Sequence, residues 1–340
     1  MTTDDLTPGT IATRAEVKAL FGGGIQGGIQ TPADGETVLV YSDPSQGVKY
    51  GYTFDGQVED DEYGPLFLYT GEGTAGDQKM SKGNKAILDT ATDGRAVLLF
   101  VSVGKKGAAK GGMRHRFVGQ VVVDPLLPYV ERQAPDESGA MRRVFVFRLR
   151  PAPGVTWSLT DEDVAMPATV NKVVELPASP KTLPPAVKEK AEATGVKDKK
   201  TEKHSTKTTV ANIPGGERQV VRREGQLVTA FEEHLTAAGH TFKSFQITVK
   251  GEAGALVPDV YDVTDNVLYE AKGKATRNAV RFAIGQLLDY RRHLKVPDGL
   301  RLAVLLPEAP SEDVRDLLKR ENILLVTQTA EGFEGFPLAT

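Results

Sequence analysis

Cysteine is absent from the 340-residue sequence, which also has a single tryptophan and a formal charge of only -3. Without cysteine the chain can form neither a disulfide nor a thiolate metal site, which fits a cytoplasmic protein. The small net charge offers no overall attraction to nucleic acid, so any such binding has to come from local patches. No apolar run approaches the roughly 20 residues that a membrane span needs, and the N-terminus does not resemble a signal peptide. We therefore expect a cytoplasmic protein with no membrane partner.

The composition is that of a globular protein, with 40% hydrophobic and 26% charged residues, and the length favours two domains. The segment from Lys181 to Lys207 has eight lysines against four acidic residues and no aromatic residue. Such a segment cannot bury a core and is typical of a flexible linker. We therefore predict one domain at residues 8–175, a lysine- and proline-rich linker at 176–216 and a second domain at 217–337.

A short β-hairpin that carries acidic residues is the clearest feature of the second half. The segments 260–263 and 267–272 are rich in β-branched and aromatic residues, and an Asp-Asn pair lies in the turn between them. Asp259 stands at the start of the first strand. Glu270 and Lys272 are two residues apart on the second strand, so their side chains point to the same face.

These residues suit the Mg²⁺-dependent cleavage of a phosphodiester bond. Carboxylate oxygens are the hard ligands that Mg²⁺ prefers, so Asp259 and Glu270 would hold the metal, and Mn²⁺ could replace it. Lys272 would orient or deprotonate the attacking water. The alternative is a solvated edge hairpin, because Glu-x-Lys triplets also occur by chance in charged proteins.

The pattern of Pro258-Asp259 followed by Glu270-Ala271-Lys272 resembles the PD-(D/E)XK nuclease superfamily. The resemblance implies that Asp259, Glu270 and Lys272 are catalytic. It also implies a fold in which a helix precedes a sheet and further helices alternate with strands, that is, an α/β sandwich like that of restriction endonucleases.

Two further residues fit this resemblance. Gln286 and Tyr290 lie one turn apart on a predicted amphipathic helix at 277–293, similar to the Q-x-x-x-Y element of RecB-like branches. Glu224 lies in a predicted helix at 222–235, where the superfamily often has an extra acidic group. A surface Glu in the first turn of a helix is an equally good interpretation of Glu224.

The elements after this helix agree with the same fold. A buried strand is predicted at 300–307, a helix capped by Ser311 at 311–320 and another strand at 323–326. The second domain is therefore expected to be an α/β sandwich.

Near the N-terminus, residues 13–21 predict a short helix with a Thr cap and a Glu at the reciprocal position. The glycine-rich run at 22–30 then follows. It lacks the Gly-Lys-Ser/Thr ending of a phosphate-binding loop. It is either a flexible loop or a loop whose backbone approaches DNA, with Gln26 and Gln30 placed to hydrogen-bond base edges.

The most distinctive segment of the chain joins a strand to a glycine loop and a helix. It contains Tyr69-Thr70-Gly71-Glu72-Gly73, then Asp77-Gln78, then Asn84-Lys85-Ala86-Ile87. This combination resembles the SRA (YDG) domain, a reader of modified cytosine. The resemblance implies a curved β-barrel with few helices, an α+β fold, that flips the modified base out of the duplex into a pocket.

By position, Tyr69 and Thr70 match the pocket pair of this family. The carboxylate that reads the base edge falls in the acidic stretch, where Asp60 and Asp61 are both candidates. The second aromatic wall departs from the longer eukaryotic pattern, and Tyr52 or Phe54 would replace it. A solvated turn is the alternative for the acidic residues.

A glycine-rich segment at 105–116 is predicted to be a basic hairpin tip between two strands. A mobile loop of this composition suits DNA phosphates or a groove. The alternative is a loop that only adds solubility. The basic residues expected to contact DNA are Lys105, Lys106, Arg114 and Arg116.

Together the two halves predict a modification-dependent restriction endonuclease. Its substrate would be double-stranded DNA containing 5-methylcytosine or 5-hydroxymethylcytosine, cut with Mg²⁺ near the modified base. A flexible linker would make the distance to the cut variable, and cutting both strands would need a homodimer. Two alternatives stay open, namely a methylated-DNA reader without catalysis and a nuclease that reads another modification or none.

Overall fold

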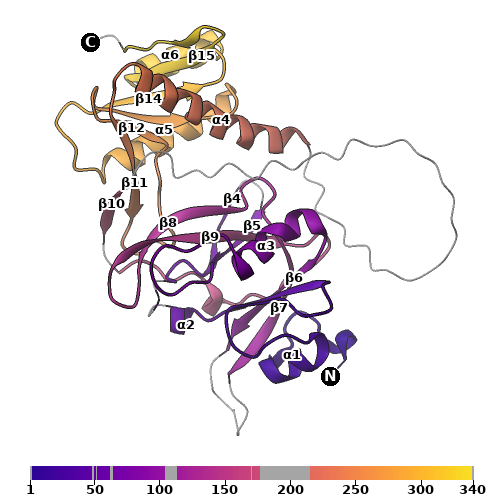
Figure 1. The fold of residues 1–340 in the computed structure, drawn as a ribbon. Helices are drawn as coiled ribbons and strands as arrows, with labels where there is room; N and C mark the ends of the chain where they lie inside the picture. The colour runs from indigo at the N-terminus through magenta and orange to yellow at the C-terminus, as the bar shows by residue number, and fades with distance from the viewer. Residues whose placement is uncertain are drawn as a thin grey trace, which may run out of the picture.

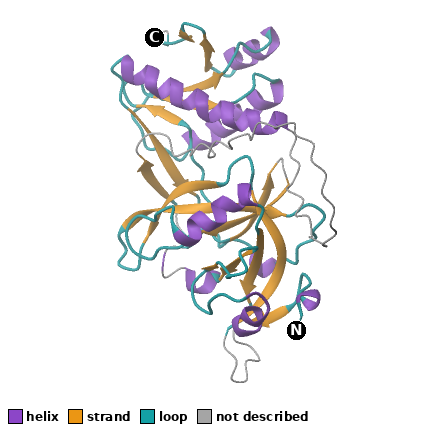
Figure 2. Ribbon diagram, turned by 45° about the vertical axis from the view of Figure 1, so that its right-hand side comes forward, coloured by secondary structure: helices purple, strands orange, loops and turns teal. Residues whose placement is uncertain are grey.

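The computed structural model describes residues 2–47, 50, 52–61, 64–103, 113–169, 171–176 and 215–338. Within these ranges the chain forms two sheets, one of nine strands and one of seven. Figure 1 shows the nine-stranded sheet in the indigo to magenta half and the seven-stranded sheet mostly in the orange to yellow half. Strands dominate the first half, whereas long helices flank the second sheet (Figure 2).

The N-terminal half is built from many strands and a few short helices. Its elements are β1 (Ile11–Thr13), α1 (Arg14–Phe21), β2 (Ile29–Gln30), β3 (Thr37–Ser42), α2 (Pro44–Gly47), β4 (Gly56–Asp61), β5 (Gly64–Thr70), α3 (Lys82–Asp93), β6 (Ala96–Ser102), β7 (Arg114–Val123), β8 (Tyr129–Pro135) and β9 (Met141–Pro151). The strands pair in the order β2-β3-β6-β7-β9-β5-β4, while β1 joins β7 and β8 joins β9.

The expected barrel is not closed among the described residues, because β2 and β4 at the two ends of this order do not pair with each other. The β2 strand has only two residues, which leaves little backbone for a closing ladder. The outer edge of β4 is taken by another segment, since Ala165 N donates to Gln57 O at 2.8 Å. The fold is therefore an open, curved sheet.

Alternation along the central strands places a hydrophobic core under α3. Val38 on β3, Leu99 on β6 and Val121 on β7 are almost fully buried and pack against Ile87 of α3. The predicted start of α1 is confirmed, since the Thr13 side chain accepts a hydrogen bond from Glu16 N and the Glu16 side chain bonds back.

The second sheet belongs mainly to the C-terminal half. Its elements are β10 (Lys172–Leu176), α4 (Gly215–Ala237), β11 (Phe242–Thr248), β12 (Val260–Asp262), β13 (Val267–Ala271), α5 (Arg277–Arg291), β14 (Arg301–Leu306), α6 (Glu312–Arg320), β15 (Ile323–Thr329) and β16 (Gly332–Glu334). The strands pair in sequence order, with β13, β14 and β15 parallel and the outer pairs antiparallel. The predicted hairpin of β12 and β13 is confirmed.

Helices cover both faces of this sheet. Leu268 and Val304 face α5 and α6 in one buried cluster. Their neighbours Tyr269 and Leu305 face Phe231 of α4 in another cluster. The period of two along each strand thus gives both faces an apolar layer. Among the described residues, no helix is long and apolar enough to cross a membrane.

Candidate functional site

The structure brings the predicted acidic residues of the hairpin together at one end of β13. Asp259 comes directly before β12 and is 1% exposed. Its Oδ2 accepts a hydrogen bond from Ala271 N at 2.8 Å. The carboxylate of Asp259 therefore lies beside the backbone that separates Glu270 from Lys272.

Glu270 and Lys272 form an ion pair at this end of the strand. Lys272 Nζ donates to Glu270 Oε1 at 2.7 Å, and the two side chains are 13% and 1% exposed. Glu270 has the same parity along β13 as Leu268, so it faces the α5 side of the sheet. The strand thus presents an acid and an amine on one face, as the sequence predicts.

Glu224 on α4 and Gln286 on α5 are the two helical residues predicted to belong to this centre. From α4, Glu224 Oε2 accepts a hydrogen bond from Gly273 N at 3.3 Å, directly after Lys272. On α5, Gln286 Nε2 donates to Tyr290 Oη at 3.0 Å, which confirms that the two side chains lie on the same face of the helix. Glu224 is therefore tied to the turn after β13, whereas Gln286 is tied to Tyr290.

A hollow of about 510 Å³ adjoins Gly273. It lies between α4, the turns after β13 and β14, and β15. Its polar lining residues are Arg223, Gln226, Lys274, Glu308 and Gln328. The sequence does not reveal this hollow, because its walls come from segments that are far apart in the chain.

The chemistry of Asp259 and Glu270 suits a divalent metal ion. Both are buried carboxylates held by hydrogen bonds to neighbouring groups, whereas the Glu224 carboxylate is bonded to Gly273 N in the turn after β13. Carboxylate oxygens are the ligands that Mg²⁺ prefers.

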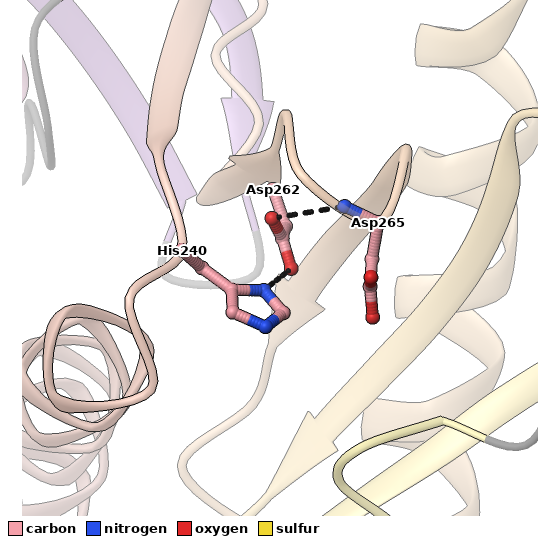
Figure 3. Close-up of side chains that lie close together, drawn as sticks. All are labelled: His240, Asp262 and Asp265. Carbon is pink, nitrogen blue, oxygen red and sulfur yellow. Dashed lines mark hydrogen bonds and ion pairs between the residues drawn. The ribbon is translucent and has the colours of Figure 1, made fainter.

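A second acidic cluster lies at the other end of the hairpin (Figure 3). Within the described residues, one group of three metal-capable side chains has all its ligand atoms within 4.8 Å of one another, namely His240, Asp262 and Asp265. Asp262 Oδ2 bonds His240 Nδ1 at 2.7 Å, and its Oδ1 accepts Thr264 N at 2.9 Å. Asp262 thus holds the hairpin turn through Oδ1 and ties it to His240 through Oδ2, which explains the cluster as structural.

In the N-terminal half, Tyr69 and Thr70 end β5 and are 3% and 1% exposed. Beside them lies Asp55, a buried acid that the sequence analysis did not single out. Asp55 Oδ1 accepts Thr70 N at 2.7 Å, and its Oδ2 accepts Ser42 Oγ at 3.1 Å. Burial raises the pKa of Asp55 to about 6, although these hydrogen bonds act in the opposite direction.

The motif residues after Tyr69 hold the loop in shape. Asn84 Oδ1 accepts Glu72 N at 2.7 Å, and its Nδ2 donates to Glu72 O at 2.9 Å. Gln78 Nε2 donates to Gly71 O, while its Oε1 accepts Phe145 N at 2.8 Å. These amide side chains act as backbone partners for a glycine loop that has no ladder of its own.

The glycine-rich run at 22–30 passes over Tyr69. A Cβ at Gly28 would lie 2.5 Å from Tyr69 Oη, so only glycine fits there without movement. Gln30 is used within this loop, since its Oε1 accepts Gly24 N at 2.8 Å and its Nε2 donates to Gln26 O. Gln26 itself is exposed.

The two aromatic candidates for the second pocket wall lie in different surroundings. Tyr52 Oη donates to Gly73 O at 2.8 Å, which places it against the motif loop. Phe54 is 6% exposed and packs in a hydrophobic cluster with Leu66 and Val130. Tyr52 is therefore in contact with the loop that carries the motif, whereas Phe54 belongs to a core.

The acidic candidates lie on β4, but the side chains of Asp60 and Asp61 are outside the part that the structure describes. The missed Asp55 directly precedes this strand, and its partners Ser42 and Thr70 are 13 and 15 residues away in the chain.

The predicted basic tip is only partly described. Lys105 and Lys106 lie outside the described residues, and Arg114 is exposed at the start of β7. Arg116 is 8% exposed, and its guanidinium pairs with Asp163 at 2.6 Å. The Arg116 side chain is thus engaged inside the domain.

Residues 8–166 match the family model described as "ScoMcrA-like, SRA domain". The match covers somewhat less than half of the 340 residues. The N-terminal half is therefore an SRA domain, which confirms the resemblance carried by the Tyr69 loop. The comparison with curated proteins finds no match.

Several solved structures are similar to the same half. The sulfur binding domain and SRA domain of ScoMcrA complexed with phosphorothioated DNA is 25% identical, with a TM-score of 0.33 over 46% of this chain and 42% of that one. The type IV phosphorothioation-dependent restriction endonuclease ScoMcrA is 26% identical, with a TM-score of 0.33 over 44% and 29%. The SUVH5 SRA complex with hemimethylated CG DNA is 22% identical, with a TM-score of 0.31 over 45% and 92%. The aligned part thus spans less than half of the two ScoMcrA chains.

Proposed function

We propose that this chain is a modification-dependent DNA endonuclease. The SRA domain would bind double-stranded DNA that contains 5-methylcytosine or 5-hydroxymethylcytosine, and the second domain, with a PD-(D/E)XK fold, would cut a phosphodiester bond nearby. One observation carries the catalytic half of the proposal. The Asp259 carboxylate is hydrogen-bonded to Ala271 N, between Glu270 and Lys272, in a buried centre at the end of a strand.

Each residue has a defined task in this proposal. Asp259 and Glu270 would hold Mg²⁺, with Mn²⁺ as a substitute, and the bound ion would polarise the scissile phosphate and lower the pKa of the attacking water. Lys272, held by Glu270, would orient that water and offset charge at phosphorus in the transition state. Glu224 would support the turn after β13 through Gly273 N, and Gln286 would line the centre from α5.

The hollow beside Gly273 supports DNA binding at this end of the sheet. Arg223 and Lys274 line it next to the catalytic strand. Such side chains can contact phosphates without reading sequence. A DNA strand that runs through the hollow would bring one phosphodiester bond close to Lys272.

The reader half of the proposal follows from the SRA family and from the position of Tyr69. The SUVH5 SRA structures are complexes with methylated DNA, and in this proposal modified cytosine would be the ligand of this SRA domain. Tyr69 and Thr70 would line the pocket for a flipped base, with Tyr52 or Phe54 as a second aromatic wall and Asp60 or Asp61 reading its edge. Double-strand cleavage would require two copies of the chain.

Cleavage of one plasmid in three forms tests the proposal. The plasmid is prepared unmodified, with methylated cytosine and with phosphorothioate linkages, and is incubated with Mg²⁺ and either wild type or Lys272→Ala. We expect wild type to cut only the methylated form and Lys272→Ala to bind this form without cutting it. Lys319→Ala, on the exposed face of α6, is the matched control and should cut like wild type.

Other outcomes would change specific parts of the proposal. Binding of methylated DNA without cutting by wild type would leave a reader without catalysis. Equal cutting of all three plasmids would show that the SRA domain has no pocket that selects a modified base. Cutting of the phosphorothioate form alone would show that the protein recognises phosphorothioate linkages and not modified cytosine.

A further inference from the structure

The edge strand of the C-terminal sheet comes from the chain before residues 177–214. β10 pairs antiparallel with β11, with Val173 opposite Ile247 and Glu175 opposite Phe245. Lys243 Nζ adds an ion pair to Glu175 Oε1 at 2.6 Å. Residues 177–214 lie outside the described ranges. They connect β10, a strand of this sheet, to α4, a helix that covers the same sheet.

A buried glutamine joins the two halves directly. Gln133 N on β8 donates to Gln246 Oε1 at 2.7 Å, and Gln246 Nε2 donates back to Gln133 O at 2.9 Å. Gln246, on β11, is 3% exposed. Its amide thus satisfies a donor and an acceptor on the backbone of β8, in the way that a neighbouring strand would.

A second set of backbone contacts lies beside this pair. Ala168 N donates to Glu252 O, and Gly251 N donates to Ala168 O, both at 2.8 Å. Lys250 N donates to the side chain of Asn171 at 2.7 Å. The segment after the SRA domain is therefore bonded to the loop that follows β11.

An apolar contact completes the interface. Ala255, from the same loop region of the second domain, packs against the hydrophobic cluster of the SRA domain that contains Phe54, Leu68 and Val146. Burial of apolar surface and satisfied backbone groups both oppose separation of the halves. The contact surface is thus built like a domain interface.

We infer that this interface holds the SRA domain at a fixed position on the second domain. It consists of the pairing of β10 with β11, the Gln133–Gln246 pair, the contacts at Ala168 and the packing of Ala255. Residues 177–214 then do not act as the tether between them. If the proposed function holds, the distance from the modified base to the cut bond is set by this interface. This last consequence rests on the proposed function, whereas the interface itself does not.

Cutting the chain within residues 177–214 tests the interface without DNA. A recognition site for a specific protease is inserted there in the full-length protein, and the protein is cut to completion and passed through a size-exclusion column. We expect the two fragments to elute together at the volume of the uncut protein. Elution as two separate fragments would overturn the inference.

A variant of the interface makes the test specific. Gln246→Ala combined with Ala255→Asp removes the amide pair and places a carboxylate against the apolar cluster. After cutting, the fragments of this variant should bind each other at least about tenfold more weakly, a change of about 1.4 kcal/mol. Gln328→Ala, at an exposed glutamine on β15, is the control. Unchanged affinity in the double variant would show that these contacts do not hold the domains.

Mapping of cut positions tests the consequence for DNA. Wild type and a variant with ten Gly/Ser residues inserted within 177–214 are given a duplex with one methylated cytosine. We expect both proteins to cut at the same position. A cut that moves or spreads with the insertion would show that the segment sets the distance. If no DNA is cut, the nuclease proposal fails, while the fragment experiment still decides the interface.

Discussion

Lys272 Nζ lies 2.7 Å from Oε1 of Glu270, the residue two positions earlier on the same face. The Lys272 ammonium bonds one oxygen of Glu270, a residue that we propose as a metal ligand. It therefore competes with a metal ion for this oxygen and repels the ion by its own positive charge. We predict that Lys272→Met binds Ca²⁺ about tenfold more tightly than wild type, a change of about 1.4 kcal/mol, because methionine neither competes for Glu270 Oε1 nor repels the bound ion. Calorimetric titration without DNA measures this change.

The same variant should lose cleavage of methylated DNA, since methionine has no charged group to orient the attacking water. Lys319→Met controls for the general loss of a positive charge. Weaker or unchanged Ca²⁺ binding by Lys272→Met would show that Glu270 is not a metal ligand.

Gly28 and Tyr69 give a prediction for the reader. Ala at position 28 would place its Cβ 2.5 Å from Tyr69 Oη, whereas the next contacts are ordinary ones at 3.7 Å and 3.8 Å. We predict that Gly28→Ala lowers the free energy of unfolding by about 1–3 kcal/mol and weakens binding of methylated DNA. Chemical denaturation and a DNA-binding titration measure the two effects.

The hydroxyl of Tyr69 alone should cause the steric clash with the Cβ added at position 28. Tyr69→Phe in the Gly28→Ala background removes that atom and should restore most of the lost stability. Gly285→Ala, in α5 with nothing within 4 Å of the added Cβ, should instead stabilise by up to about 1 kcal/mol. A double variant no more stable than Gly28→Ala would contradict the explanation.

Local patterns predicted the elements that carry Asp259, Glu270 and Lys272. The hairpin around Asp259, the helix of Gln286 and the strand at 301–306 each follow from a repeat of two or 3.6 within one segment. Their pairing follows because sequential strands tend to be neighbours. The convergence of Asp259, Glu270 and Lys272 could therefore be inferred before any coordinates.

What the sequence did not predict depends on contacts between distant segments. Asp55 is defined by Ser42 and Thr70, which lie 13 and 15 residues away. Gln246 meets Gln133 across 113 residues. The β10 strand was not predicted for the same reason, because it pairs with the distant β11. It also directly precedes the lysine-rich segment, which made it look like the start of a linker.

Asp55 leads to a prediction about pH. Its folded-state pKa of about 6 lies above the ordinary value of 3.8. The folded protein therefore binds this proton more tightly than the unfolded chain, and the free energy of unfolding falls as the pH rises through this window. Asp55→Asn lacks this dependence. We predict that the stability of wild type relative to Asp55→Asn decreases by at most about 3 kcal/mol between pH 4 and pH 7.

Urea denaturation of both proteins across this range measures the difference, and subtraction removes the titration of the groups that they share. A difference that stays constant, or that favours wild type more as the pH rises, would mean that burial does not raise the pKa of Asp55.

The hollow at the end of β13 predicts how DNA binding responds to salt. Arg223 and Lys274 line it at the end of β13, next to Gly273. If each contacts one phosphate, its replacement by Ala releases one counterion fewer on binding, so the slope of log affinity against log salt decreases by about 0.9 for each residue. Fluorescence anisotropy with a methylated duplex in Ca²⁺ measures the slopes.

The loss of affinity should be equal for methylated and unmethylated DNA, because a phosphate contact carries no information about the base. Lys319→Ala should leave the slope unchanged, and an unchanged slope in Arg223→Ala and Lys274→Ala would show that the backbone of the DNA does not pass through the hollow.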